Sequence, residues 1–235
     1  MSDRIYYDFH IHSCLSPCGD SDMTVNNIVN MAVLKGLGAI ALTDHNSCKN
    51  CPPFLAAAKK SGIKALPGME ITTMEEVHAI CLFKNLGSAM AFDSYVYDLL
   101  PDIKNRPEIF GEQILIDEKD QNIGHVDKLL VNATSISFYD LSGLMEQFGG
   151  IYFPAHIDRP SFSLLSNLGS FPPDCPVNAF EITDISNYES ILAKNPDILG
   201  VPSLVNSDAH YLWKISEPVN VLHGKMYELL KDWLK

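Results

Sequence analysis

Long hydrophobic runs are absent from this 235-residue sequence, which has no stretch of about 18 apolar residues able to cross a membrane. The N-terminus has no secretory signal pattern, because Met-Ser-Asp-Arg leads straight into a short apolar segment. No linker, internal repeat or low-complexity segment divides the chain. The sequence therefore predicts one domain over residues 1–235, located in the cytoplasm and without a membrane partner. It does not indicate an oligomeric state.

Positive charge is also scarce, since 17 lysines and arginines stand against 29 aspartates and glutamates, for a net charge of −12. No basic stripe with interleaved aromatic residues is visible, so we expect no binding of duplex nucleic acid. A surface this acidic repels polyanions. Divalent cations held in a site would make its mouth locally positive, and binding of a phosphate group there stays open.

The six cysteines do not predict a disulfide framework in a chain expected in the cytoplasm. Two pairs stand out, Cys14 with Cys18 and Cys48 with Cys51, and each follows a segment that contains histidine. If the two loops are neighbours, four sulfurs could hold a structural zinc ion or form a redox pair. Reduced thiols without a ligand are the favoured interpretation.

Histidine is concentrated at the ends of apolar runs. Six of the eight histidines lie in a series of short segments. The segments are His10-Ile11-His12, Thr43-Asp44-His45, Gly68-Met69-Glu70, Val77-His78, Pro154-Ala155-His156 and Ser207-Asp208-Ala209-His210. Residues two apart on a strand point to the same side, so both can reach one ion. A lone histidine beside an apolar run is more often a packed core residue, but the repeated placement favours a metal site. His125 and His223 match no motif, and we expect both at the surface.

Apolar runs alternate with helical patterns. The expected strands are Ile5–His10, Ala39–Thr43, Ile63–Pro67, Val77–Phe83, Gly150–Pro154, Val177–Thr183 and Pro202–Asn206, and the expected helices are Thr24–Lys35, Pro52–Ser61, Ser137–Phe148 and Lys225–Trp233. Several strands are too uniformly apolar to be half solvated, as in a buried parallel sheet. The alternation predicts an α/β barrel with the histidine segments at the carboxyl ends of its strands. Residues 85–128 are expected to be an irregular excursion, apart from a strand and turn within 113–122.

The ordered motifs His-x-His, Thr-Asp-His, Gly-x-Glu with His eight residues later, Ala-His and Ser-Asp-Ala-His resemble the PHP (polymerase and histidinol phosphatase) family. The resemblance extends over roughly residues 5–211. It implies a distorted (β/α)7 TIM-like barrel with a trinuclear metal centre at the carboxyl ends of its strands. It also implies hydrolysis of phosphate esters, as in the stand-alone bacterial members of the family.

The resemblance implies three metal sites, with Glu70 as the bridging carboxylate. The first is formed by His10, His12, Glu70 and Asp208, the second by Asp20, His45 and His210, and the third by Glu70, His78 and His156. In the loop we choose Asp20 over Asp22, because Asp20 lies four residues before Thr24, where a helix is expected to begin. Asp44 is expected to accept a hydrogen bond from a ring N–H. Such mixed ligands suit two or three zinc, manganese or iron(II) ions better than magnesium.

Water bound between such ions becomes hydroxide near neutral pH. The implied activity is a metal-dependent phosphoesterase that hydrolyses a monoester or terminal phosphodiester of a small metabolite, a nucleotide or a short oligonucleotide. Glu70, Asp208 and His210 are the catalytic candidates, with Asp208 or a histidine as the general acid. Arg159 is a candidate phosphate clamp, because a guanidinium binds phosphate with two hydrogen bonds. Its alternative is a salt bridge with Asp158 or another acid; Asn46 and Asn206 are further substrate-binding candidates.

Three other functions stay open at this point. One is a histidinol-phosphate phosphatase, and another is a PHP-like regulatory domain that binds metals without turnover. The third is C–N bond hydrolysis, as in amidohydrolase barrels, which share His-x-His on the first strand. Those enzymes usually place a lysine at a later strand end, whereas Glu70 has the bridging role here, and this makes the third function less favoured.

Overall fold

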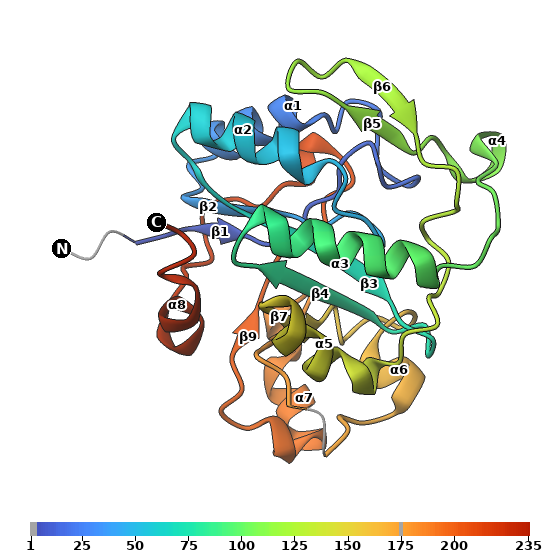
Figure 1. Ribbon diagram of the computed structural model, residues 1–235. Coiled ribbons are helices and arrows are strands. Elements are labelled where there is room, and N and C mark those ends of the chain that lie inside the picture. Colours follow the sequence, from blue (N-terminus) through green and yellow to red (C-terminus); the bar gives the residue numbers. More distant parts are fainter. Residues whose placement is uncertain (1–3, 174–175) are drawn as a thin grey trace.

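A mixed sheet of five strands forms the centre of the computed structural model, which describes residues 4–173 and 176–235 (Figure 1). Its strand order is β1-β2-β3-β4-β7. The strands are β1 (Tyr7–Asp8), β2 (Ala39–Leu42), β3 (Lys64–Thr72), β4 (His78–Phe83) and β7 (Gly150–Pro154). Strands β1, β2 and β3 are parallel, whereas β4 is antiparallel to both β3 and β7.

The direction of β4 corrects the expectation of a parallel sheet. Only residues 73–77 separate β3 from β4, and the backbone N–H of Thr73 donates to the carbonyl of Val77 within this turn. A parallel neighbour needs a crossover of a dozen or more residues, so a connection this short allows only a hairpin. Because β4 runs backwards, its first residue, His78, lies at the same edge as the carboxyl ends of β2 and β7.

The expected strands near the C-terminus are present but short. β8 (Phe180–Glu181) pairs in parallel with β9 (Ser203–Leu204). Backbone bonds join this pair to the main sheet, since the N–H of Ile157 donates to the carbonyl of Glu181 over 2.9 Å. A parallel bridge between Ile11 and Ala209 brings the segment after β9 beside the segment after β1. The chain thus folds as a curled α/β sheet consistent with the distorted barrel that was predicted.

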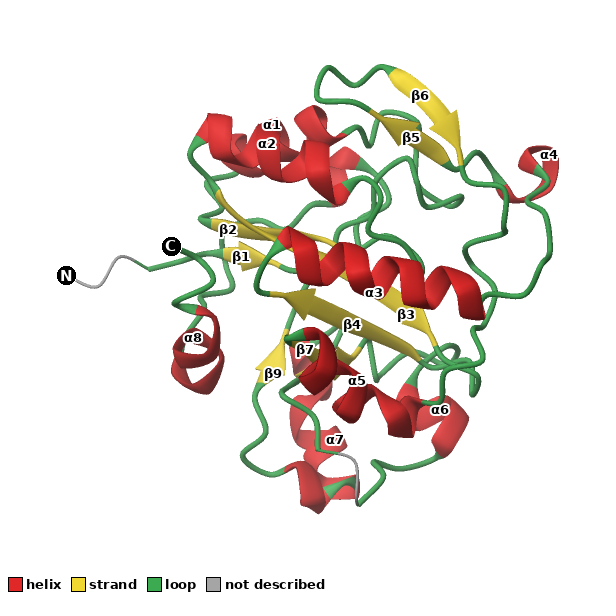
Figure 2. Cartoon of the chain, viewed as in Figure 1, coloured by secondary structure: helices red, strands yellow, loops and turns green. Residues whose placement is uncertain are grey.

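Helices lie on both sides of the sheet (Figure 2). The helices are α1 (Val25–Leu34), α2 (Cys51–Ser61), α3 (Leu86–Leu99), α4 (Pro107–Phe110), α5 (Leu141–Phe148), α6 (Leu164–Leu168), α7 (Tyr188–Lys194) and α8 (Gly224–Leu230). Four of them, α1, α2, α5 and α8, match the expected helices within a few residues. No helix among the described residues combines the length and apolar character that spanning a membrane requires.

The prediction of an irregular segment over residues 85–128 is wrong for its first part. Helix α3 has 14 residues, and the side chain of its N-cap residue Asn85 accepts a hydrogen bond from the backbone N–H of Ser88. Ala89, Phe92 and Val96 form the buried stripe of an amphipathic helix. The expected strand and turn are confirmed as β5 (Ile114–Ile116) and β6 (Asn122–His125), which form a separate hairpin.

Both faces of the sheet are buried, and β2 shows how its residues are divided between them. Ile40 and Leu42 belong to the larger apolar cluster, which includes residues of α1 and α2. Ala39 and Ala41 belong to a second cluster, which includes Met226 of α8. Successive side chains of a strand point to opposite faces, so one strand contributes to both clusters. This double burial fixes the strand ends from which the polar side chains project.

Candidate metal centre

Eight of the nine side chains predicted as metal ligands converge at one edge of the sheet. His10 and His12 follow β1, His45 follows β2, Glu70 lies in β3, His78 begins β4, His156 follows β7, and Asp208 and His210 follow β9. Seven of them form three overlapping groups, and within each group the ligand atoms lie within 4.8 Å of one another. The eighth is His156, whose Nε2 lies 3.2 Å from Oε1 of Glu70. The groups are His10-His12-Glu70-Asp208, His12-His45-His210 and His45-Glu70-His78.

Glu70 is the centre of this arrangement. Its carboxylate is buried and is surrounded by imidazole nitrogens at 2.9–3.3 Å. These imidazoles are those of His10, His12, His45, His78 and His156. The Nε2 atoms of His10 and His12 also lie 3.2 Å and 3.1 Å from Oδ1 of Asp208. One edge of the sheet therefore presents two carboxylates to six imidazoles.

Unsatisfied polar atoms indicate that this cluster is built to hold cations. Seven buried side-chain nitrogen and oxygen atoms of the described residues make no hydrogen bond of acceptable geometry, and four of them belong to the cluster, where close contacts between carboxylates and imidazoles are poorly directed for hydrogen bonding. These four are His45 Nδ1, Glu70 Oε2, His156 Nδ1 and Asp208 Oδ1. A buried polar atom without a partner costs about 1–3 kcal/mol, and ligation of a metal ion removes that cost. The donor set of imidazoles and carboxylates fits a site for more than one metal ion.

The charges of the cluster support the same interpretation. Burial by itself raises the pKa of the Glu70 carboxyl, but the imidazoles of His78 and His10 lower it well below its usual range. The pKa of Asp208 is also lowered, because His10 and His12 outweigh its burial. Both carboxylates are therefore ionised at neutral pH. Burial lowers the pKa of His10, but the carboxylates of Glu181 and Asp208 raise it above its usual value. A metal ion that binds His10 must then displace a proton from it, so metal affinity should rise with pH.

Glu181 is a residue of the site that the sequence reasoning missed. Its buried carboxylate lies 3.0 Å and 3.1 Å from Nδ1 of His10, and it accepts hydrogen bonds from the backbone N–H of His156 and the amide of Asn206. A carboxylate at Nδ1 orients the ring and leaves Nε2 free for a metal ion. The one signal in the sequence is an acid inside the apolar run from Ala179 to Ile182.

The prediction that Asp44 accepts a hydrogen bond from a ring N–H is wrong. Its carboxylate accepts from the backbone N–H and the hydroxyl of Ser13, and from the hydroxyl of Ser16, each at 2.7 Å. Since the Ser16 hydroxyl donates to Asp44, its oxygen is free to accept from Nδ1 of His12 at 2.9 Å. Asp44 thus orients His12 through Ser16 instead of touching a ring itself.

Asp20 is a predicted ligand that is in none of the groups, and unlike His156 its side chain has no contact with Glu70. Its carboxylate accepts from the backbone N–H of Asp22 at 2.9 Å and closes a turn of its own loop. The exposed thiol of Cys18 contacts the imidazoles of His45 and His210 instead. Desolvation raises the pKa of this thiol, but the two imidazoles lower it to about 5.

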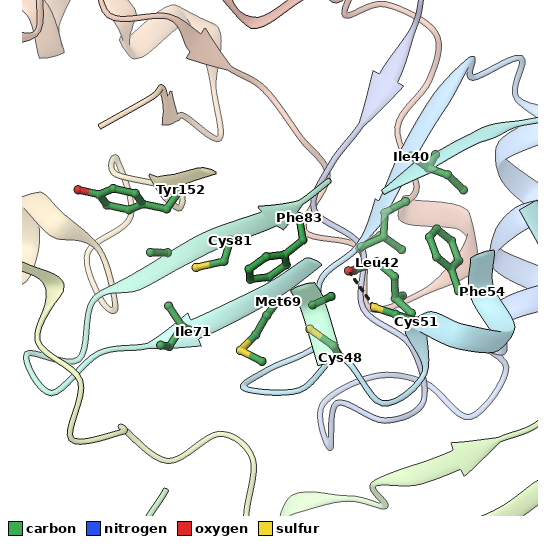
Figure 3. Close-up of a cluster of buried hydrophobic side chains, with 14 of the residues drawn as sticks. Ile40, Leu42, Cys48, Cys51, Phe54, Met69, Ile71, Cys81, Phe83 and Tyr152 are labelled. Atoms are coloured by element: carbon green, nitrogen blue, oxygen red, sulfur yellow. Dashed lines mark hydrogen bonds between the residues drawn. The ribbon is translucent and has the colours of Figure 1, made fainter. Parts of the chain in front are cut away.

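The two cysteine pairs do not form a four-sulfur site. Cys48 and Cys51 lie in the apolar cluster with Phe54 and Met69 (Figure 3). The Cys48 thiol donates to the carbonyl of Gly68. No sulfur belongs to the candidate metal groups of the described residues, and the described cysteines are free. Cys175 lies outside the described residues.

The substrate-binding candidates divide into two kinds. Arg159 lies beside a cavity of about 190 Å³ at the metal groups, and its Nη1 donates to Oδ2 of Asp208 over 2.5 Å. Asp158 is not its partner, because that carboxylate accepts backbone N–H groups of residues 183 and 184.

The two asparagines instead hold the backbone in place. The amide of Asn46 donates to the carbonyls of Leu130 and Asn132 and accepts from the N–H of Thr72. The amide of Asn206 accepts from the N–H of Phe9 and donates to Glu181. Both side chains are buried and bonded within the protein, which argues against a contact of either with substrate. The two histidines without a motif, at positions 125 and 223, are exposed as predicted.

The model of the PHP domain matches residues 8–153, so this chain belongs to the PHP domain family. The 5′-3′ exoribonuclease Rnm of Escherichia coli is 35% identical over 85 residues, which are 34% of this chain and 28% of that protein. The PolC-type DNA polymerase III of Streptococcus agalactiae serotype III is 36% identical over 75 residues, which are 32% of this chain and 5% of the polymerase. The chain thus matches a small part of each curated relative.

Solved structures share the fold at lower identity. A protein of Bifidobacterium adolescentis described as a candidate metal-dependent phosphoesterase superposes with a TM-score of 0.65 at 17% identity, over 96% of both chains. The lesion-specific endonuclease Q of Pyrococcus furiosus superposes with a TM-score of 0.62 at 19% identity, over 89% of this chain and 49% of that chain.

Proposed function

We propose that this PHP domain is a metal-dependent phosphoesterase that hydrolyses a phosphate monoester or a terminal phosphodiester of a small metabolite, nucleotide or short oligonucleotide. The observation that carries the proposal is the cluster of eight ligand-type side chains that includes the buried carboxylate of Glu70. The names of the relatives add support, because they include an exoribonuclease, an endonuclease and a candidate phosphoesterase.

We propose that these side chains hold two or three divalent ions, of zinc, manganese or iron, in the ligand sets that the family resemblance implies. The first ion would be held by His10, His12, Glu70 and Asp208, the second by His45 and His210, and the third by Glu70, His78 and His156. Bound ions supply an activated water and compensate the charge of the phosphate oxygens. Asp20 has no part in this assignment, because its carboxylate closes its own turn.

The remaining roles belong to side chains at the mouth of the cavity. Arg159 is half-exposed and already bonded to Asp208, so it is placed to bind a phosphate oxygen beside the ions. The lowered pKa of Asp208 leaves no proton on this carboxyl near neutral pH, which argues against Asp208 as the general acid. His210 lines the same cavity as a proposed metal ligand, and this role excludes it as the general acid.

The test is hydrolysis by protein loaded with manganese or with zinc. The substrates are an aryl phosphate, a panel of phosphorylated metabolites that includes histidinol phosphate, 5′-phosphorylated short oligonucleotides, and a duplex with an abasic site. We expect turnover of single-stranded or small substrates and none of the duplex. Bound metal with no turnover of any substrate would favour a regulatory domain and overturn the proposal.

A further inference from the structure

Phe162 stands beside the metal groups with a large aromatic side chain that is 45% exposed. It lines the same cavity as His78 and Arg159. One face of its ring packs on the imidazole of His78, with centroids 4.9 Å apart and planes 24° apart. The exposed part of the ring is therefore presented at the mouth of the cavity.

The backbone holds this ring in an unfavourable conformation. Phe162 has a φ of +51°, which bulky residues rarely adopt. Its carbonyl accepts from the backbone N–H of His78 over 3.0 Å. The next residue, Ser163, forms the capping box of α6 with Ser166, and its hydroxyl donates to the carbonyl of Arg159. The loop is tied at both ends, so the ring has a fixed place. Strain of this kind is concentrated at functional sites.

The size of the cavity indicates what the ring would contact. A volume of about 190 Å³ is smaller than the roughly 300–1,000 Å³ of sites that enclose a whole ligand. A phosphate group at Arg159 and the metal ligands would fill it, and the rest of the ester would extend past the rim. Phe162 is the aromatic side chain that lines this rim. Aromatic side chains bind the faces of bases by stacking, without regard to base identity.

We propose that Phe162 is a stacking platform for a planar ring in the phosphate ester, so that nucleotides and 5′-phosphorylated single strands are preferred over aliphatic phosphates. The proposal rests on the phosphoesterase function and specifies its substrate class. Arg159 would bind the phosphate, and Phe162, three residues later, would bind the base. The opposing possibility is that Phe162 only positions His78.

The experiment compares a purine nucleoside 5′-monophosphate and a 5′-phosphorylated dinucleotide with ribose 5-phosphate, which lacks a base, using metal-loaded enzyme. Phe162→Leu removes the ring and keeps an apolar side chain, and Phe162→Trp restores a ring. Tyr139→Leu is the control, because Tyr139 is an aromatic residue at least as exposed as Phe162 and does not line the cavity. Thermal melts establish that each variant is folded.

We expect Phe162→Leu to lower kcat/KM about 10-fold or more for the two substrates with bases, mainly through KM, and to leave ribose 5-phosphate unchanged. Phe162→Trp should retain the preference, and Tyr139→Leu should match the wild type. Equal losses on all three substrates would mean that Phe162 only positions His78, and an absent preference for bases in the wild type would also overturn the proposal. Hydrolysis of no phosphate ester by the loaded wild type would instead overturn the phosphoesterase function.

Discussion

The chain before residue 155 and the chain after it hold their parts of the metal centre in different ways. Before it, the strands β2, β3, β4 and β7 have four to nine residues and pair in one sheet, whose edge strand β1 has two residues. After it, β8 and β9 have two residues each, yet this part supplies His156, Glu181, Asp208 and His210. The comparison shows that side chains of one centre can be positioned by a strand ladder in one region and by other contacts in another.

Those other contacts are buried hydrogen bonds between side chains and backbone. The amide of Asn206 accepts from the N–H of Phe9 over 2.8 Å. The carboxylate of Asp8 accepts from the N–H groups of Ser207 and Ser216 over 3.1 Å and 2.9 Å. Glu181 joins His10 to the N–H of His156. Polar side chains thus replace ladder pairing after residue 155, so substitutions there should act through lost hydrogen bonds.

The largest effect is expected at Glu70, a residue of the earlier region that a side chain of the later region also contacts. Glu70 lies on β3, and His156 from the later region contacts its carboxylate. Glu70→Gln removes the charge that faces five imidazoles. His10→Ala removes a predicted ligand from the group that also contains Glu70 and Asp208. We expect each to lower kcat/KM by about 10³-fold or more, because metal catalysis supplies several kcal/mol of the barrier reduction. Steady-state kinetics with circular dichroism of the folded state would measure this. His125→Ala is the matched control, and turnover retained in both site variants would remove the metal mechanism.

The next effect concerns the carboxylate that joins the two regions. Glu181→Gln keeps the shape of the side chain but removes the charge beside Nδ1 of His10. We expect metal affinity to fall about 10–100-fold, as is typical when the partner of a ligating imidazole is lost. Competition with a chromophoric chelator would measure it. Asp158→Asn is the control, because Asp158 bonds the backbone after β8 without contacting His10. Equal affinities of the two variants would show that Glu181 does not orient the ligand.

The third effect tests whether the later region depends on single hydrogen bonds. Asn206→Ala leaves the buried N–H of Phe9 without its partner, so we expect the free energy of unfolding to fall by about 1–3 kcal/mol. Hydrogen exchange should show that β8 and β9 lose protection before β3 and β4 do. Asn46→Ala removes a similar amide from the earlier region and should not produce this order. Uniform loss of protection in Asn206→Ala would contradict the difference between the regions.

The sequence predicted the earlier region better than the later one, for physical reasons. The strands Ala39–Thr43 and Gly150–Pro154 were found because uniform burial leaves a strong apolar pattern. Of the strand expected over 177–183, only Phe180 and Glu181 pair in a ladder. The polar contacts that hold this part of the chain leave no periodic pattern in the sequence. The reversal of β4 could have been predicted, because the nine residues between the strands expected over 63–67 and 77–83 are too few for a parallel crossover. Helix α3 was missed although Asn85 gives a capping signal.

In the site, residue type and order predicted His10, Glu70 and Asp208 as neighbours, because these side chains are read from motifs at strand ends. Glu181 belongs to no motif, and its partner His10 is 171 positions away, so only the fold brings them together. Asn46 was predicted to touch substrate because it follows His45, but its amide donates to backbone carbonyls instead. Adjacency in sequence does not determine the direction of a side chain, which the backbone φ and its hydrogen bonds decide.

The smallest effect should come from a side chain–backbone link within the earlier region. Glu75, in the turn between β3 and β4, accepts from the hydroxyl of Ser137 and the N–H of Phe138 over 2.5 Å and 2.9 Å. Partial burial raises the pKa of the Glu75 carboxyl, but these hydrogen bonds lower it below its usual value. The unfolded state therefore binds a proton more readily, so the stabilisation is present above the unfolded pKa of about 4.3 and is lost as pH falls through the folded one.

Because this carboxylate is partly exposed, we expect Glu75→Gln to lower the free energy of unfolding by less than about 1 kcal/mol at pH 7. Urea unfolding at pH 7 and at pH 3 would measure the difference, which should shrink at the lower pH. Glu146→Gln, at an exposed position on α5, is the control and should show no pH-dependent difference. A loss as large as that of Asn206→Ala would mean that the earlier region depends on single polar links as much as the later one does. The sheet ladder of β3, β4 and β7 would then no longer explain why the two regions differ.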